Sequence, residues 1–434
     1  MRYDVVVAGG GLSGVTAAIS AARGGAKVCL VEQTLTLGGL GTSGMMTVII
    51  SPKKFFGGTG REILDRLYGE DALGYGKGKD DYSFVPFQNE AMKRLLDSMI
   101  SEEANIDLLL YSKIIGAKCE NGGVKSITVS AYEGIFEVEA DVFIDATGDG
   151  ALAVLCGEDY EYGDGNENIQ APTLPSYYVN VDYTKYYNFL KENNYDFIGT
   201  VKGLVEKAVD EGVLSDVDYH HPGENRITAD IASMNVGHLY GMPLKSSKDF
   251  TAAMIAGRRL VREYYEFYKK YIPGFENSVC VATGSLLGVR ETRRIKGKYM
   301  ISYADKCEYR KFPDAVMRFE GGPSYDLHAS SGSKDDYEKY FSKYTAENIR
   351  ENDYATIPFS SFCAAKNNNL MVVGRCFSSD RFVNAQNRVM GYCAMMGDVA
   401  GAAAALSNKN KVRLCEISIY ELQKKLQHMG ILNV

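Results

Sequence analysis

The 434 residues are 45 % hydrophobic and 24 % charged, which is typical of a globular chain with room for two domains. Lysine and arginine number 48 against 55 acids, so the net charge is −7 and argues against nucleic acid or an anionic membrane surface as a partner. The nine cysteines are scattered without a C-x-x-C pair, which argues against iron–sulfur and zinc sites and favours a reducing cytoplasm without a bound metal.

Targeting and membrane segments are not predicted. The chain begins directly with a strand pattern and shows no charged leader region. The most apolar stretch, 389–406, contains Asp398 and three glycines, so we expect a buried helix rather than a membrane span. The cytoplasm is therefore the expected location.

The first 32 residues form the most informative pattern. An apolar strand at 3–8 runs into a glycine-rich turn, a small-residue helix and a second strand that ends at Glu32. Gly9 permits the tight turn, Gly11 lets a pyrophosphate approach the backbone, and Gly14 lets the helix pack on the strand. Glu32 lies about 20 residues beyond the glycines, where a carboxylate can accept hydrogen bonds from ribose hydroxyls. The pattern predicts a bound dinucleotide, NAD or FAD; the alternative is a glycine-rich turn that binds no ligand.

The helix after this turn begins near Leu12 and Ser13. A helix N-terminus carries about half a positive charge and free N–H groups. Both properties suit the diphosphate of a dinucleotide.

The rest of the first 150 residues continues an α/β pattern. A second glycine-rich loop at 37–44 has so few side chains that a bulky ligand can lie against its backbone. Asn89 caps a predicted helix that reaches about residue 104. Strand patterns follow at 106–110, 114–119, 124–130, 134–140 and 142–145.

From residue 151 to 353 the pattern is mixed and rich in tyrosine. Helices are predicted at 183–193, 202–211 and 247–271. The α/β pattern returns from residue 354, with a buried strand at 370–373 and the small-residue helix at 389–406, and residues 411–434 form a helical tail. We therefore expect an α/β fold in which 1–150 and 354–410 build one Rossmann-like nucleotide-binding domain. Residues 151–353 are an inserted α+β substrate domain.

The sequence contains one dinucleotide fingerprint. A second glycine-rich stretch, 74–78, lacks a preceding strand, so we interpret it as a loop. An enzyme that reduces a flavin with NADPH commonly carries a second fingerprint. Its absence favours electrons from the substrate itself or from a protein or quinone carrier.

These motifs resemble those of the two-dinucleotide-binding-domain flavoproteins. The resemblance rests on the 9–14 glycines with Glu32, on Gly38 and Gly39, and on the Asp-Ala-Thr-Gly-Asp-Gly turn at 145–150. With the segments 287–294 and 374–390, the chain resembles the bacterial FAD-dependent oxidoreductase family, distantly related to fumarate-reductase and glucose-inhibited-division flavoproteins. It departs at 391–393, where Gly-Tyr-Cys replaces the usual Pro-Thr-Cys, and at 398–401, where Asp-Val-Ala-Gly replaces Gln-Ala-Ala-Gly.

The resemblance implies non-covalent FAD and a Rossmann-like FAD-binding domain. The expected contacts with the adenosine and pyrophosphate end are Gly9, Gly11, Leu12, Ser13, Gly14, Glu32, Ala146, Thr147, Gly148 and Asp149. The expected contacts with the flavin, ribityl and phosphate end are Gly38, Gly39, Thr42, Ser43, Gly374, Arg375 and Arg388.

Four residues are candidates for catalysis: Arg290, Arg388, His238 and His328. Arg388 lies at a helix N-terminus that would stabilise the negative charge of the reduced flavin. If 288–294 is a helix, Arg290 and Arg294 share a face. They then either fix an anionic or hydroxylated substrate or form a structural salt-bridge hub. His238 and His328 are the better candidates among five histidines for a base that takes a hydroxyl proton as hydride leaves.

The favoured reaction is therefore hydride removal from a small polar substrate, such as a carbohydrate or hydroxy acid, to flavin N5. One alternative is a fumarate-reductase-like reductase of an activated C=C bond, with an arginine as proton donor. Another is an RNA-modification-type FAD protein, which the acidic charge disfavours. The expected partners are a small-molecule substrate and an electron acceptor or donor of unspecified kind, with no nucleic acid and no membrane. Assembly into a homo-oligomer stays open.

Overall fold

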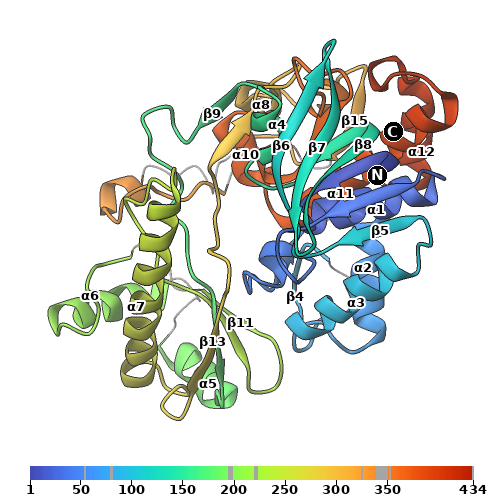
Figure 1. Cartoon of the computed structure of the whole chain (residues 1–434). Coiled ribbons are helices and arrows are strands. Elements are labelled where there is room, and N and C mark those ends of the chain that lie inside the picture. The colour runs from blue at the N-terminus through green and yellow to red at the C-terminus, as the bar shows by residue number, and fades with distance from the viewer. Residues whose placement is uncertain are drawn as a thin grey trace.

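The computed structural model of the chain describes all residues except 53–54, 79–81, 194–198, 219–222, 324–325, 339–349, 351–352 and 433–434. Two histidines of the sequence, at 220 and 221, lie outside the described residues. The described elements form a mixed α/β fold around a largely parallel sheet (Figure 1).

The main sheet is ordered β5-β2-β1-β8-β7-β6, and β17 pairs with β8 beside this path. Its parallel strands are β1 (Arg2–Ala8), β2 (Val28–Val31), β5 (Ile106–Leu109), β8 (Gly134–Asp145) and β17 (Leu370–Val372). The antiparallel strands are β6 (Lys113–Glu120) and β7 (Gly123–Ala131). Because β17 pairs in parallel with the end of β8, a C-terminal strand completes a sheet that the N-terminal strands begin.

One long strand, β8, replaces two predicted ones. Its first half pairs with β7 in a hairpin, and its second half pairs with β1 and then β17. The predicted segments 134–140 and 142–145 are therefore continuous. The side chains of Phe143 and Ile144 are fully buried on opposite faces of the sheet, which accounts for the uninterrupted apolar run of a strand covered on both sides.

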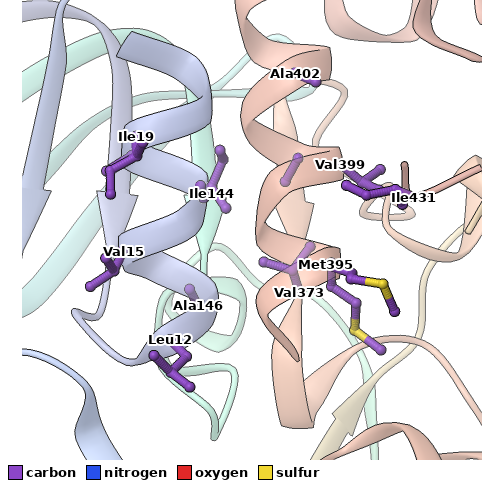
Figure 2. Packing of buried hydrophobic residues seen from close by; sticks show 14 of the residues in the cluster. Leu12, Val15, Ile19, Ile144, Ala146, Val373, Met395, Val399, Ala402 and Ile431 are labelled. Atoms are coloured by element: carbon purple, nitrogen blue, oxygen red, sulfur yellow. The ribbon is translucent and has the colours of Figure 1, made fainter. Parts of the chain in front are cut away.

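Two helices pack side by side against this sheet, α1 (Leu12–Arg23) and α11 (Met390–Asn410), as Figure 2 shows. A Cβ on Gly397 would lie 2.1 Å from the carbonyl oxygen of Ser13, and one on Gly401 would lie 2.3 Å from that of Ala17. Only glycine therefore permits this approach. From the first contact to the second, the position advances by four residues along each helix, so the two helices run in the same direction. The hydroxyl of Thr16 donates to the carbonyl of Ala394 (2.7 Å) across the contact.

The remaining elements of this part lie around the helix pair and the sheet. They are β3 (Val48–Ile50), α2 (Gly58–Gly69), β4 (Phe84–Pro86), α3 (Asn89–Ser101), α4 (Ala151–Leu155), α8 (Tyr303–Cys307), β15 (Ala315–Phe319), β16 (Ala355–Pro358), α10 (Arg381–Asn387) and α12 (Ile419–His428). Short 3-10 turns lie at Gly39–Gly41, Phe359–Ser361, Gly374–Cys376 and Leu414–Glu416. The predicted C-terminal tail is packed rather than free, because Leu422, Leu426 and Ile431 are fully buried in the main core.

A second group of elements lies to one side of the main sheet in Figure 1. It contains an antiparallel sheet ordered β11-β12-β10-β13, from Gly223–Arg226, Ala232–Asn235, Ser176–Val179 and Val279–Thr283. Around it lie α5 (Tyr183–Glu192), α6 (Gly199–Asp210) and α7 (Ser247–Tyr271). Its core includes Tyr178, Tyr186, Tyr264, Tyr268 and Phe275, so these tyrosines serve packing.

Over the described residues 288–294 the structure does not contain the helix that a shared face of Arg290 and Arg294 would need, and the predicted cap at Asn89 is wrong. Residues 288–294 are extended: Gly288 pairs with Thr173, and β14 (Arg293–Ile295) pairs with β9 (Tyr160–Tyr162). The shared helical face of Arg290 and Arg294 therefore does not exist. Asn89 does not cap α3, because Gln88 occupies the cap position.

No single helix in the described ranges is long and apolar enough to cross a membrane. By length and composition alone, the pair α10 and α11 passes together, bent by 96°. Within α11 the side chains are mostly buried in the fold.

Candidate active site

The turn between β1 and α1 shows why glycine stands at 9, 11 and 14. Gly9 has φ +93°, and a Cβ there would lie 2.8 Å from the carbonyl oxygen of Ala146. A Cβ on Gly14 would lie 1.8 Å from the oxygen of Gly9. By contrast, a Cβ on Gly11 would meet no described atom within 4 Å. The fold itself requires two of the glycines, whereas the third borders open space where a ligand can approach the backbone.

Glu32 is buried at the end of β2 and holds the glycine turn. One carboxylate oxygen accepts from the backbone N–H of Gly10 at 2.6 Å, and the other accepts from that of Thr34 at 2.7 Å. Each carboxylate oxygen has a further lone pair. Glu32 can therefore position the turn and still accept from a ribose hydroxyl.

The second glycine loop lies against the first. Gly38 pairs with Gly11, and its N–H donates to the carbonyl of Gly10 at 2.8 Å. The side-chain amide of Asn89 donates to the carbonyl of Thr42 at 2.7 Å, so α3 anchors this loop. A Cβ on Gly39 would meet only Gly11 and would lie 3.2 Å from its Cα.

The same loop also touches the second group of elements. The carbonyl oxygen of Ser43 accepts from the backbone N–H groups of Ser285 (2.8 Å) and Leu286 (3.2 Å). The segment that leads to Arg290 therefore begins beside the second glycine loop.

The turn from Ala146 to Asp149 is held by the buried Asp145 and the partly buried Arg375. Asp145 accepts from the backbone N–H (3.0 Å) and hydroxyl (2.7 Å) of Thr147, and burial raises the pKa of its carboxyl. Arg375 donates to the carbonyls of Gly148 (3.0 Å) and Val289 (2.8 Å) and to Asp149 (2.7 Å). Burial opposes ionisation of Asp149, but Arg375 outweighs it and keeps the pKa below its ordinary value. Arg375 thus ties this turn to the segment that carries Arg290.

Two helix N-termini meet at this place. Among the described residues, no side chain caps α1 or α11. The helices are parallel and adjacent, so both positive ends lie at the carboxyl edge of the sheet. A Cβ on Gly374 (φ +79°) would lie 2.6 Å from the hydroxyl of Ser13, which brings the C-terminal segment directly over the start of α1.

A line of hydrogen-bonded side chains begins in the buried part of the second group. The carboxylate of Asp218 lies 2.8 Å from Nδ1 of His238 and accepts from its backbone N–H at 3.0 Å. The phenol of Tyr240 donates to the other carboxylate oxygen at 2.8 Å. Burial opposes ionisation of Asp218, but the interactions with His238 and Tyr240 outweigh it and lower its pKa. Burial and Asp218 together raise the pKa of Tyr240.

The line continues outward to a more exposed end. Nε2 of His238 lies 2.9 Å from Nδ1 of His328, and Nε2 of His328 lies 3.3 Å from Asp326. The other oxygen of Asp326 lies 3.2 Å from a guanidinium nitrogen of Arg388. Side-chain exposure rises from 2 % at His238 to 12 % at His328 and 33 % at Asp326, so the line runs from the interior toward solvent.

Arg290 lies near this line and is buried, with 5 % of the residue exposed. Its Nη1 donates to the carbonyl of Ala171 at 2.7 Å. Burial, followed by the nearby charge of Arg388, lowers its pKa to about 9. The four residues predicted as catalytic, Arg290, Arg388, His238 and His328, are therefore brought together.

The neighbouring arginines form a structural hub instead. Glu291 is 1 % exposed and pairs with Arg294 (2.5 Å) and Arg381 (3.0 Å), and it also accepts from the backbone N–H of Gln170 (3.0 Å). The structural alternative for the arginine-rich segment therefore holds for Arg294, which belongs to this hub. Arg290 forms no ion pair with Glu291 among the described contacts and lies near Asp218, Asp326 and Arg388.

The sequence profile of the family described as FAD dependent oxidoreductase matches residues 4–426, nearly the whole chain. The chain belongs to this FAD-dependent oxidoreductase family. Its expected cofactor, FAD, and its class as an oxidoreductase are those of the family. The open backbone at Gly11 and the uncapped N-terminus of α1 fit the diphosphate of FAD.

A curated relative is digeranylgeranylglycerophospholipid reductase of Methanothrix thermoacetophila, 30 % identical over 159 residues. The match covers 34 % of this chain, and in it the chain spans only 40 % of the relative's length. Among solved structures, a geranylgeranyl bacteriochlorophyll reductase-like protein from Thermoplasma acidophilum has 14 % identity and a TM-score of 0.47, covering 98 % of this chain and 83 % of that one. The anhydrotetracycline hydroxylase OxyS from Streptomyces rimosus has 13 % identity and a TM-score of 0.47, covering 99 % and 66 %.

Sequence reasoning missed three members of the line in this oxidoreductase: Asp218, Tyr240 and Asp326. No motif marks them, because Asp218 lies 20 residues from His238 and Asp326 lies 62 residues from Arg388. It also missed the anchoring role of Asn89.

Proposed function

We propose that this FAD-dependent oxidoreductase removes a hydride from a hydroxyl-bearing carbon of a small polar substrate, a carbohydrate or a hydroxy acid. The observation that carries the proposal is the line Asp218–His238–His328–Asp326, which ends beside Arg388. Bound FAD supplies the hydride acceptor, N5 of the flavin. The residues of the chain must then bind the substrate, orient it and take the hydroxyl proton.

The line can accept one proton at a defined atom. Its three contacts along Asp218, His238, His328 and Asp326 need three protons on the four ring nitrogens. Two neutral imidazoles carry only two. Asp218 fixes a proton on Nδ1 of His238, so Nε2 of His238 accepts from Nδ1 of His328. Nε2 of His328, beside Asp326 at the more exposed end of the line, is then the atom that would accept the hydroxyl proton.

Asp218 and Tyr240 hold His238 in the orientation that this transfer needs. A proton taken up at Nε2 of His328 can shift along the shared hydrogen bond, so that the positive charge resides on His238 beside buried Asp218. The charge produced by oxidation is thereby kept away from the exposed end. We assign Asp218 and Tyr240 as positioning residues.

We further propose that FAD lies over the glycine turn, with its diphosphate at the start of α1. Glu32 would bind the adenosine ribose, the loop at Gly38 and Gly39 would border the flavin, and the N-terminus of α11 would face its N1–C2=O edge. Residues 1–150 and 354–410 would form this domain, and residues 151–353 the substrate domain. The scattered cysteines support the cytoplasm as the working location.

Anaerobic titration tests the direction of the reaction. Hydroxy acids and sugars are added singly to the FAD-loaded protein, and the visible flavin band is recorded. A hydroxylated substrate is expected to bleach the band, and NADPH alone is not. If only NADPH bleaches it, hydride removal from a hydroxylated substrate is wrong.

A second candidate is reduction of an activated C=C bond. Burial and Arg388 lower the pKa of Arg290 to about 9, which makes this guanidinium a better proton donor than an exposed one. The curated relative is also named as a reductase. Reoxidation of dithionite-reduced protein by an enoate but not by a ketone would favour this reaction over the first.

A further inference from the structure

A cavity of about 500 Å³ lies between α12 and the strands β15 and β16. This volume is within the range of about 300–1,000 Å³ that is typical of small-molecule sites. The side-chain amide of Gln423, on α12, donates to the carbonyls of Pro313 and Ala315, both at 3.0 Å, so the two walls are hydrogen-bonded to each other. Of the described residues that line this cavity, none belongs to the glycine turns or to the histidine line. The cavity therefore shares no lining residue with the candidate active site.

The charged side chains that line the cavity are cations. They are Lys311, Arg318 and Lys424, and no carboxylate is among the described lining residues. Lys311 is paired with Asp353 at 2.8 Å, which leaves two cations. Within the described part of the chain, neither the guanidinium of Arg318 nor the ammonium of Lys424 forms an ion pair or a hydrogen bond. The cavity therefore carries positive charge that the protein itself does not balance.

Arg318 has the strongest need for a partner. Its Nε is buried without a hydrogen-bond partner among the described residues, and its Cζ lies 4.0 Å from the centroid of the Tyr354 ring. The ring attracts the positive charge but offers none of the oxygen acceptors that the N–H groups have in water. A buried charged donor without an acceptor is costly. A phosphate, which a guanidinium binds through paired N–H donors, would remove this cost.

An aromatic side chain lines the same cavity beside the other free cation. Tyr420 is 64 % exposed, and Nζ of Lys424 lies 4.5 Å from its ring centroid. Because Lys424 comes four residues after Tyr420 on α12 (Ile419–His428), the two side chains meet on one face of that helix. An exposed aromatic ring can stack against a nucleobase, and such stacking strengthens binding whichever base is present. A ligand that uses both residues carries an anionic group close to a planar ring.

We propose that this cavity binds a mononucleotide. Its phosphate is held by Arg318 from β15 and Lys424 from α12, and its base stacks on Tyr420. The phosphate thereby bridges the two walls of the cavity. The proposal adds a nucleotide site to that of FAD, and it does not depend on the reaction at the flavin.

Three related ligands test the proposal. The FAD-loaded protein, in which the cofactor site is already filled, is titrated by calorimetry with AMP, with adenosine and with ribose 5-phosphate. Adenosine lacks the phosphate, and ribose 5-phosphate lacks the base. We expect AMP to bind roughly 10- to 100-fold more tightly than either, the effect of one or two charge-assisted hydrogen bonds or of one stacked base. Binding of AMP that is no tighter than that of adenosine, or no tighter than that of ribose 5-phosphate, would overturn the proposal.

Variants assign the two parts of the nucleotide to the two kinds of residue. Arg318→Gln and Lys424→Gln are each expected to weaken the binding of AMP and of ribose 5-phosphate roughly 10-fold and to leave that of adenosine unchanged. Tyr420→Ala is expected to weaken the binding of AMP and of adenosine and to leave that of ribose 5-phosphate unchanged.

Exposed positions elsewhere supply matched controls. Arg259→Gln on α7 and Tyr132→Ala, in the turn between β7 and β8, should leave all three affinities unchanged. Lys424 and Tyr420 are exposed, so their variants decide the question if Arg318→Gln does not fold. The visible absorbance of the flavin shows that each variant keeps its FAD. An affinity for AMP that survives both Lys424→Gln and Tyr420→Ala, or that falls equally in the controls, would contradict a nucleotide site in this cavity.

Discussion

Replacing Asp398 by asparagine tests how α11 is tied to α2. The carboxylate of Asp398 is fully buried and accepts from the backbone N–H (2.8 Å) and the hydroxyl (2.6 Å) of Thr59, at the start of α2. The family usually has glutamine at this place. Asparagine keeps the volume and an acceptor for the backbone N–H, and it removes the titrating group.

The size and sign of the effect follow from the pKa of Asp398. Burial raises it from the ordinary 3.8 to about 7. Between these values the folded protein binds one proton more than the unfolded protein, so the free energy of unfolding falls as pH rises. A shift of about three units corresponds to a loss of about 4 kcal/mol between about pH 4 and about pH 7.

Urea unfolding followed by circular dichroism measures this loss. Other carboxyls titrate in the same range, so the useful quantity is the difference in unfolding free energy between the protein and Asp398→Asn, measured at several values between about pH 5 and about pH 8. We expect the free energy of unfolding of the protein, relative to that of the variant, to fall by about 3 kcal/mol across this range and to change no further above it. A difference that stays constant with pH, or that increases, would refute the assignment of a protonated Asp398 in the folded state.

Two further variants test the binding of FAD and the packing of α1 against α11. Glu32→Ala removes the acceptor of the Gly10 N–H, so we expect FAD to bind roughly 10- to 100-fold more weakly by fluorescence titration. The exposed Glu70→Ala is the control, and an unchanged FAD affinity in Glu32→Ala would contradict its role. Gly397→Ala places a Cβ 2.1 Å from Ser13, so we expect about 1–3 kcal/mol of lost stability in thermal unfolding. Gly69→Ala, which meets no atom within 4 Å, should lose little, and equal losses in both would count against the close helix contact.

The residues expected to bind FAD could be predicted from the sequence because their motifs are local. Gly9, Gly11 and Gly14 lie within six residues; Gly9 and Gly14 meet backbone constraints that other residues cannot meet, and Gly11 borders open space. The return of a C-terminal strand to the N-terminal sheet was also predicted, because the α/β pattern resumes from residue 354; its pairing with β8 in particular was not predicted.

The hydrogen-bonded line around His238 and His328 was harder to predict from the sequence, because its contacts join distant parts of the chain. His238 and His328 are 90 residues apart, and neither lies in a motif. The arginine-rich segment misled for a local reason. The spacing of Arg290 and Arg294 suits a helix, but Gly288 and the residues from Arg293 pair as strands, so the two side chains enter different networks. Tertiary pairing overrides local spacing there.

The rate of flavin reduction in His328→Gln tests the central claim most directly. The protein, the variant and the exposed control His428→Gln are mixed anaerobically with a hydroxylated substrate at saturation, and loss of the visible flavin band is followed in time. Because a positioned base contributes about 10²–10⁴-fold, we predict a loss of that size in His328→Gln alone, with FAD content unchanged. Equal rates in all three proteins would show that the histidine line does not take the substrate proton.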